Sequence, residues 1–144
     1  MKRRNLRGIL LLAGLMAVSV GVAAQQQPPL GTAADVDAFA KALESCTAAT
    51  VHTQHPLMKA FIVEHKITGT ENEKCGYRQT MPGRMNMICG LSAAGRKSAA
   101  TDLRAMASAQ SIKGSTSAAG PTWMKECEIE MPDGKRIPAV GKAG

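Results

Sequence analysis

Four cysteines constrain the folding of this 144-residue chain more than any other feature. They are Cys46, Cys75, Cys89 and Cys127, an even number with no C-x-x-C spacing among them. That spacing is typical of thioredoxin-type redox pairs and of zinc ribbons, so neither class of site is indicated. The cysteines instead predict two structural disulfides in a small exported protein.

The N-terminal residues predict export. Residues 1–7 carry four basic side chains and no acid, and the next 16 positions, 8–23, carry no charge. The small residues Val22, Ala23 and Ala24 then precede Gln25, which completes the pattern of a cleavable signal peptide. A retained membrane anchor is the alternative, but 16 residues are fewer than the roughly 20 that span a bilayer. We therefore expect a periplasmic or secreted protein that begins at Gln25, with no transmembrane segment after cleavage.

The charge of the chain depends largely on this segment. The whole sequence has a formal net charge of +7, and residues 1–24 contain four of its 18 basic residues and none of its 11 acidic ones. The remaining chain therefore carries +3, and it has no basic stripe with interleaved aromatic residues. Nucleic acid is not a predicted partner. Hydrophobic residues make up 44% of the sequence, which is typical of a globular domain.

The first half of the exported chain predicts a helix and then strands. Residues 25–31 are a polar, Pro-rich leader that we expect to be flexible. Thr32 with Asp35 three positions on resembles a capping box, and the apolar period of the following residues predicts a helix to about Thr47. Cys46 lies on the apolar face of that helix. From Leu57 the period changes to two, which predicts a strand with one solvated face and with Phe61, Val63, His65 and Ile67 on the other face.

A hairpin is predicted next. Residues 69–73 form a turn, and Cys75, Tyr77 and Gln79 then share one strand face. Met81-Pro82-Gly83 is a second turn. If these three residues form the loop, Tyr77 pairs with Met87 and Cys75 pairs with Cys89, which places the apolar residues of both strands on one face.

The last part of the chain predicts a helix, a linker and a hairpin. Ser92 can cap a helix that runs to about Gln110, and residues 108–121 are a Ser/Ala/Gly-rich linker. Residues 123–131 form a strand, with Glu126, Glu128 and Glu130 on its solvated face. Pro138 suits an edge strand in the hairpin of residues 122–140. The sequence predicts a small α+β domain: an N-terminal helix, an antiparallel meander, a second helix and a C-terminal hairpin, with residues 32–107 as the core.

The hairpin register leads to a disulfide map. It joins Cys75 to Cys89 and leaves Cys46 to pair with Cys127, a bridge that would tie the C-terminal hairpin to the core. The competing maps join Cys46 to Cys75 or to Cys89.

Residues 43–97 resemble a family of small, exported proteobacterial proteins of unknown function. The resemblance rests on seven short motifs: Leu43-Glu44-Ser45-Cys46, His55-Pro56, Lys66-Ile67-x-Gly69, Lys74-Cys75-x-Tyr77, Met81-Pro82, Met87-x-Cys89 and Arg96-Lys97. In that family a cysteine stands at the position of Val51, and Cys127 lies outside the shared region. The resemblance therefore implies that Cys46 has changed its partner, and it implies no activity.

One group of side chains suggests metal chemistry. Met81, Met85 and Met87 lie on neighbouring strand positions, and His52 and His55 precede them. Thioethers are soft ligands that favour Cu(I), so these five residues form a candidate copper site. Core packing is the favoured interpretation, because methionines must fill a core that has only four aromatic residues, and copper binding is the alternative. No other cofactor is predicted.

No motif names an enzyme. The sequence has neither a phosphate-binding glycine loop nor G-x-S-x-G, and Arg96 and Lys97 indicate a solvated helix turn more than an anion site. We expect a non-enzymatic interaction or binding module whose partner is a protein or another envelope component. A copper-binding protein is the first alternative, and a hydrolase with a concealed site is the second.

Overall fold

The computed structural model describes residues 27–108 and 121–140. The predicted signal peptide, residues 1–24, and nearly all of the predicted linker lie outside the described residues. The elements follow in chain order: α1 (Ala33–Ser45), β1 (Ala49–Gln54), β2 (Ile62–Glu71), β3 (Lys74–Met81), the 3-10 turn η1 (Pro82–Arg84), β4 (Met85–Leu91), α2 (Ala93–Ala107), the 3-10 helix η3 (Thr122–Glu126), β5 (Cys127–Glu130) and β6 (Arg136–Pro138).

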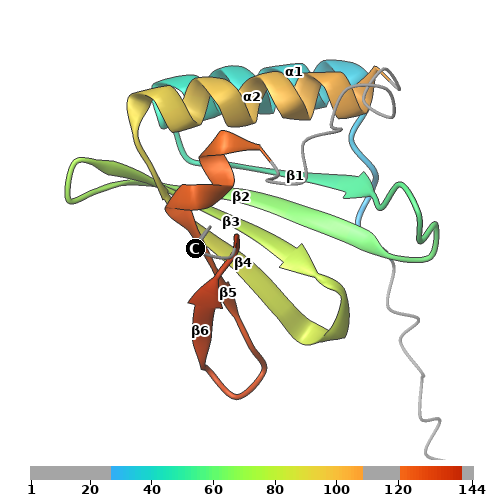
Figure 1. Ribbon diagram of the computed structural model, residues 1–144. Helices are drawn as coiled ribbons and strands as arrows, with labels where there is room; N and C mark the ends of the chain where they lie inside the picture. The colour runs from blue at the N-terminus through green and yellow to red at the C-terminus, as the bar shows by residue number, and fades with distance from the viewer. Residues whose placement is uncertain (1–26, 109–120, 141–144) are drawn as a thin grey trace, which may run out of the picture.

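The strands form one antiparallel sheet in the order β1-β2-β3-β4-β5-β6, and α1 and α2 lie side by side across one of its faces (Figure 1). This confirms the predicted α+β class for the described residues. The C-terminal hairpin does not pack on the core as a separate unit. It continues the sheet through pairing of β5 with β4. None of the helices in residues 27–108 and 121–140 has the length and apolarity to cross a bilayer.

The start of α1 confirms the predicted capping box. The Thr32 hydroxyl accepts a hydrogen bond from the Asp35 amide at 3.3 Å, and the Asp35 carboxylate accepts one from the Thr32 amide at 2.8 Å. These bonds satisfy two backbone donors that would otherwise lack partners at a helix N-terminus. The helix ends where Cys46 adopts a left-handed conformation with φ of 56°.

The sequence reasoning missed β1 and began the next strand too early. Residues 57–61, which were expected to open that strand, form a turn, and β2 begins at Ile62. Pro56 explains part of the error, because proline cannot donate a ladder hydrogen bond. Of the four residues predicted to share one face, Val63, His65 and Ile67 are buried, whereas Phe61 lies in the turn before β2 and is only partly buried.

The pairing of β3 with β4 differs from the prediction by two residues. Tyr77 lies opposite Cys89, not Met87, and the three-residue turn is 82–84, not 81–83. A shift of two leaves every side chain on its predicted face, because strand side chains alternate with a period of two. The apolar pattern therefore could not distinguish the two registers. The backbone of the turn selects one of them, with Gly83 at φ of 73°.

The predicted disulfide map is wrong. The bridges join Cys46 to Cys75 and Cys89 to Cys127. In the observed register Cys89 lies opposite Cys127 on β5, whereas Cys75 lies opposite Leu91 and is left to the cysteine at the end of α1. Cys46 still ties its helix to the sheet, as its place on the apolar face of α1 predicted.

The C-terminal segment begins as a 3-10 helix, not as the predicted strand over residues 123–131. The Trp123 ring is buried and packs edge-on against Tyr77, with ring centroids 6.0 Å apart. Its indole Nε1 donates to the Asp102 carboxylate of α2 at 2.7 Å. Seating this ring against α2 requires the backbone to turn before it enters β5. Pro138 lies on β6, the edge strand, as predicted.

The two helices are joined by one arginine. Arg104 of α2 donates from Nε to Asp37 at 2.8 Å and from Nη1 to Glu44 at 2.6 Å, and both acids lie on α1. The core lies between these helices and the sheet and includes both disulfides and Met87. Among residues 27–108 and 121–140, no helix lies over the opposite face of the sheet (Figure 1).

Candidate functional site

Three of the five predicted copper ligands are methionines on the helix-covered face. Met81 lies directly opposite Met85 across the β3–β4 pair, so these two side chains are neighbours. Met87 lies two positions further along β4, is 2% exposed and belongs to the core. For Met87 the observed role is core packing, the interpretation that the sequence favoured.

The two predicted histidine ligands lie apart from Met87. His52 is on the uncovered face, where its Nε2 is 3.3 Å from Oε2 of Glu64. His55 binds its own loop, because its Nδ1 accepts hydrogen bonds from two backbone amides. A hollow of about 610 Å³ at this end of the sheet is bordered by His52, Met81 and Met85. Within the described residues, no group of three or more His, Cys, Asp or Glu side chains is arranged to hold a metal ion.

A chain of buried polar groups runs through the core. His65 donates or accepts at both ring nitrogens: Nε2 is 2.9 Å from the Thr53 hydroxyl, and Nδ1 is 2.8 Å from the Tyr77 hydroxyl. The Tyr77 hydroxyl is in turn 3.1 Å from Oε1 of Gln79, to which it donates. Tyr77 therefore accepts from Nδ1 of His65, and the neutral imidazole accepts at Nε2 from Thr53.

Burial sets the protonation of this chain. It lowers the pKa of His65 from 6.5 to about 4, with a smaller contribution from the nearby His52. Burial also raises the pKa of Tyr77 above its ordinary value. A hydroxyl beside a histidine is the arrangement of a nucleophile and its base. His65 is only 2% exposed, however, so this contact serves to satisfy buried polar groups in the core.

The sequence placed His65 on the inner face but did not predict this network. The available signal was a polar residue at an apolar position of a strand, followed by a tyrosine on the next strand. The prediction gave no register between the strands of His65 and Tyr77, so it could not pair these two residues. It also left β1 out, and therefore had no partner for the second ring nitrogen of His65.

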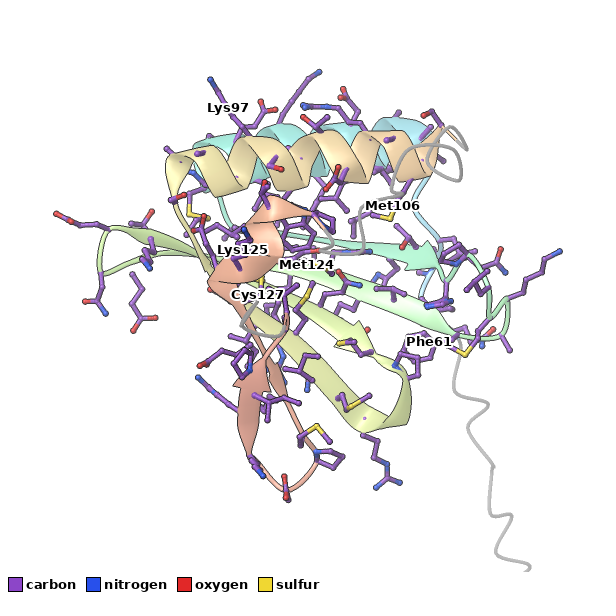
Figure 2. The ribbon with its side chains drawn as sticks, viewed as in Figure 1. Phe61, Lys97, Met106, Met124, Lys125 and Cys127 are labelled. Carbon is purple, nitrogen blue, oxygen red and sulfur yellow. A yellow bond between two sulfur atoms is a disulfide. The ribbon has the colours of Figure 1, made fainter. Side chains whose placement is uncertain are left out.

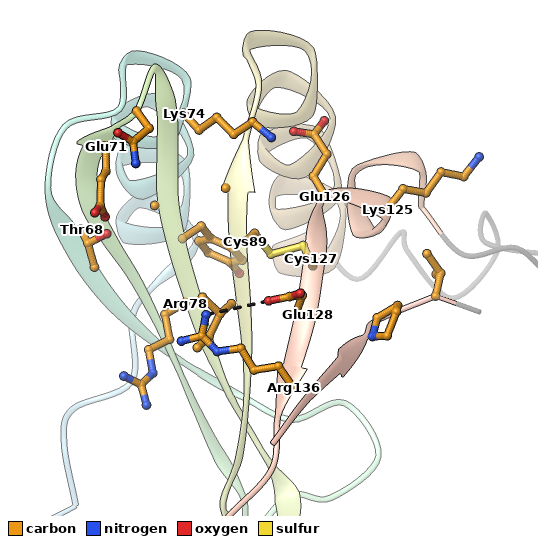
Figure 3. A pocket seen from close by; sticks show the side chains of 17 residues that line it. Thr68, Glu71, Lys74, Arg78, Cys89, Lys125, Glu126, Cys127, Glu128 and Arg136 are labelled. Atoms are coloured by element: carbon orange, nitrogen blue, oxygen red, sulfur yellow. Dashed lines mark ion pairs between the residues drawn. A yellow bond between two sulfur atoms is a disulfide. The ribbon is translucent and has the colours of Figure 1, made fainter. Parts of the chain in front are cut away.

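The uncovered face of the sheet carries a groove of about 1610 Å³. Figure 3 shows Glu71, Lys74 and Arg78 on one side of it and Lys125, Glu128 and Arg136 on the other. Gly76 and Gly90 lie opposite each other in its floor. The side chains of Thr68 and Lys74 lean over these glycines, so that a Cβ at Gly76 would be 2.1 Å from the Thr68 hydroxyl oxygen.

Oppositely charged side chains form ion pairs on this face of the sheet. Arg136 of the edge strand lies 3.8 Å from Glu128 and 3.2 Å from Glu130, and Arg78 lies 3.8 Å from Glu130. Glu128 and Glu130 therefore lie on a solvated face, as expected, but they are paired with arginines. Exposed pairs of this kind contribute at most about 1 kcal/mol each to stability.

The third predicted member of that acidic row, Glu126, also borders the groove but does not lie on the strand with the other two. It belongs to η3, and its carboxylate accepts from the Ser92 amide at 2.5 Å and from the Ser92 hydroxyl at 2.8 Å. Gly95 permits this approach, because a Cβ there would be 2.7 Å from Oε1 of Glu126. The N-terminus of α2 is thus occupied by a carboxylate of the protein itself, which the helix dipole favours. Lys97 is exposed, in agreement with the solvated interpretation of that turn, whereas Arg96 is only partly exposed and its Nε is buried.

Comparison of the chain with models of known protein families, with curated proteins and with solved structures gave no match. The resemblance of residues 43–97 to a family of exported proteobacterial proteins therefore stays a prediction.

Proposed function

We propose that this protein is an exported, non-enzymatic binding module that holds its partner in the groove on the uncovered face of the sheet. The observation that carries the proposal is the asymmetry of the two faces. One face is closed by α1, α2 and η3, whereas the other is a hollow of about 1610 Å³. Two disulfides are compatible with an exported protein, since such bonds persist in oxidising compartments.

The groove suits a polypeptide segment. Its surface combines apolar groups, such as Ile88 and Pro138, with both cations and carboxylates. An interface of this composition gives specificity by matching charges of both signs along an extended partner. The partner class that fits is therefore a segment of another envelope protein that carries both acidic and basic side chains.

Site-specific photo-crosslinking in the exporting cell tests the proposal. A photoreactive residue replaces Ile88 at the floor of the groove, and a matched one replaces Lys97 on the outer face of α2 (Figure 2). We expect a discrete adduct from position 88 and none from position 97. Equal labelling from both positions, or no adduct from position 88, contradicts the groove as the binding surface. N-terminal sequencing of the same exported material is expected to begin at Gln25.

A copper-binding protein is the second candidate, favoured by the cross-strand pair Met81–Met85 beside His52 at one hollow. Titration of the mature protein with Cu(I) in the presence of ascorbate tests it, since ascorbate keeps copper reduced and leaves the disulfides in place. Saturable binding tighter than micromolar that is lost in the variant M81L/M85L supports copper binding. Weaker binding, or binding unchanged in that variant, excludes it.

A further inference from the structure

The turn between β1 and β2 exposes two apolar side chains at one end of the sheet. Leu57 is 88% exposed and Met58 is 40% exposed, and Lys59 follows them. Single exposed apolar residues are ordinary on soluble proteins. This turn differs because its backbone is held in a fixed shape by its own side chains.

Several backbone groups of the turn are satisfied internally. Nδ1 of His55 accepts from the amides of Leu57 and Met58 at 3.2 and 3.1 Å. The amide of Phe61 donates to the carbonyl of Met58 at 2.8 Å, and the side-chain amide of Gln54 donates to the carbonyl of Lys59 at 2.8 Å. Backbone groups that already have partners cost little to transfer out of water. The turn can therefore enter an apolar phase without losing its shape.

The neighbouring turn between β3 and β4 lies beside it. Phe61 (Figure 2), Met81, Met85 and Arg84 border the same hollow of about 610 Å³. We call residues 55–61 and 81–85 together the loop tip. It contains two exposed cations, Lys59 and Arg84, and its sequence contains no acidic residue. The charged side chains of the loop tip itself are thus both positive, although Glu64, which is paired with His52, also borders the hollow.

The chain also enters the fold at this end. Gln27 and Pro28, the first described residues, border the same hollow. The preceding 26 residues, which carry the predicted export signal, therefore join the fold beside the loop tip.

We propose that the loop tip docks on the surface of a bilayer that contains anionic lipid. Leu57 and Met58 enter the interfacial region, where their burial is favourable. Lys59 and Arg84 contact lipid phosphates at the depth of the headgroups. This contact surface is separate from the groove, so the docking leaves the groove free for its partner.

Co-sedimentation of the mature protein, residues 25–144, with vesicles tests the proposal. One set of vesicles is phosphatidylcholine alone and the other contains equal parts of phosphatidylcholine and phosphatidylglycerol. We expect binding to the anionic vesicles at millimolar lipid that weakens with added salt, and much less binding to the neutral ones. No binding to the anionic vesicles overturns the proposal.

Three variants separate the contributions. K59Q/R84N removes both cations and is expected to lower the partition coefficient roughly thirty-fold. L57S/M58S removes the apolar contact and is expected to lower it at least ten-fold. The matched control K97Q/M106S removes a cation and a 46% exposed methionine from α2 and is expected to bind as the unchanged protein does. Circular dichroism verifies that each variant is folded.

The outcomes distinguish this proposal from the groove. If the control weakens vesicle binding as much as the loop-tip variants do, the attraction is non-specific and the proposal is wrong. If the loop-tip variants keep vesicle binding but lose the photo-crosslinked adduct at position 88, the tip is a protein-contact surface instead. Loss of vesicle binding with an unchanged adduct supports the two surfaces as independent.

Discussion

On the helix-covered face of the sheet, His65 and Met87 are each 2% exposed and serve the core. At the loop tip, His55 is partly exposed and Met58 is 40% exposed. The imidazole of His65 links side chains of three strands, whereas that of His55 binds only its own turn. The comparison teaches that residue type does not assign a role in this protein. Strand parity and the local backbone do.

The largest test of the covered face removes a disulfide. Cys46–Cys75 and Cys89–Cys127 close loops with separations of 29 and 38 residues. In the chain-entropy model each stabilises the protein by roughly 4 kcal/mol. We expect the double variants C46A/C75A and C89A/C127A to lose about that much free energy of unfolding, measured by urea denaturation.

The two disulfide variants should differ in where they loosen. Without Cys89–Cys127, hydrogen exchange should quicken first in β5 and β6, and emission from Trp123, the only tryptophan in the chain, should shift to the red. Without Cys46–Cys75, faster exchange should begin at the end of α1. The same exchange pattern in both variants contradicts this division.

The next largest effect is a loss of stability in acid that originates at His65. Its pKa in the folded state, about 4, lies below the value of 6.5 expected for the unfolded chain. The unfolded state therefore binds more protons between these values, so stability falls as the pH is lowered from about 6.5 to 4. The depression corresponds to roughly 3 kcal/mol. Urea midpoints measured across this range check the prediction.

A double variant isolates the histidine from other titrating groups. H65F/Y77F removes both partners of one buried hydrogen bond and keeps the rings that fill the core. We expect its stability to vary much less between pH 6.5 and 4 than that of the unchanged protein. An unaltered pH dependence would show that other groups govern the acid transition.

A smaller effect is expected where Glu126 caps α2. G95A should cost about 1 kcal/mol, because the new Cβ displaces the carboxylate that accepts from Ser92. The same change in the E126A background should instead stabilise by several tenths of a kcal/mol, since alanine favours a helix over glycine. Thermal melts of the four proteins complete this cycle, and additive effects contradict the mechanism.

The smallest effect on stability is expected at the loop tip. L57S removes a side chain that is 88% exposed, so the free energy of unfolding should change by less than about 0.5 kcal/mol. The same substitution should weaken vesicle binding. A large loss of stability would mean that Leu57 packs in solution, and the contrast with the covered face would then disappear.

The sequence determined which way the side chains of α1, α2, β2, β3 and β4 face. The periods of 3.6 and two predicted α1, α2 and the inward faces of β2, β3 and β4, because burying one face of each element is the main favourable term in folding. Thr32 and Ser92 marked where the helices begin. These properties are local, so a single chain suffices to infer them.

Only the tertiary structure decided how the elements meet. A register shift of two keeps every face unchanged, so the pattern around Tyr77 allowed either pairing, and with it either cysteine partner. The hydrogen bond from Ser92 to Glu126 joins residues that are 34 positions apart in the sequence. The one from Trp123 to Asp102 joins residues that are 21 positions apart. Such contacts depend on the packing of the whole core. Residue periodicity records burial and carries no information about which distant group fills the space opposite.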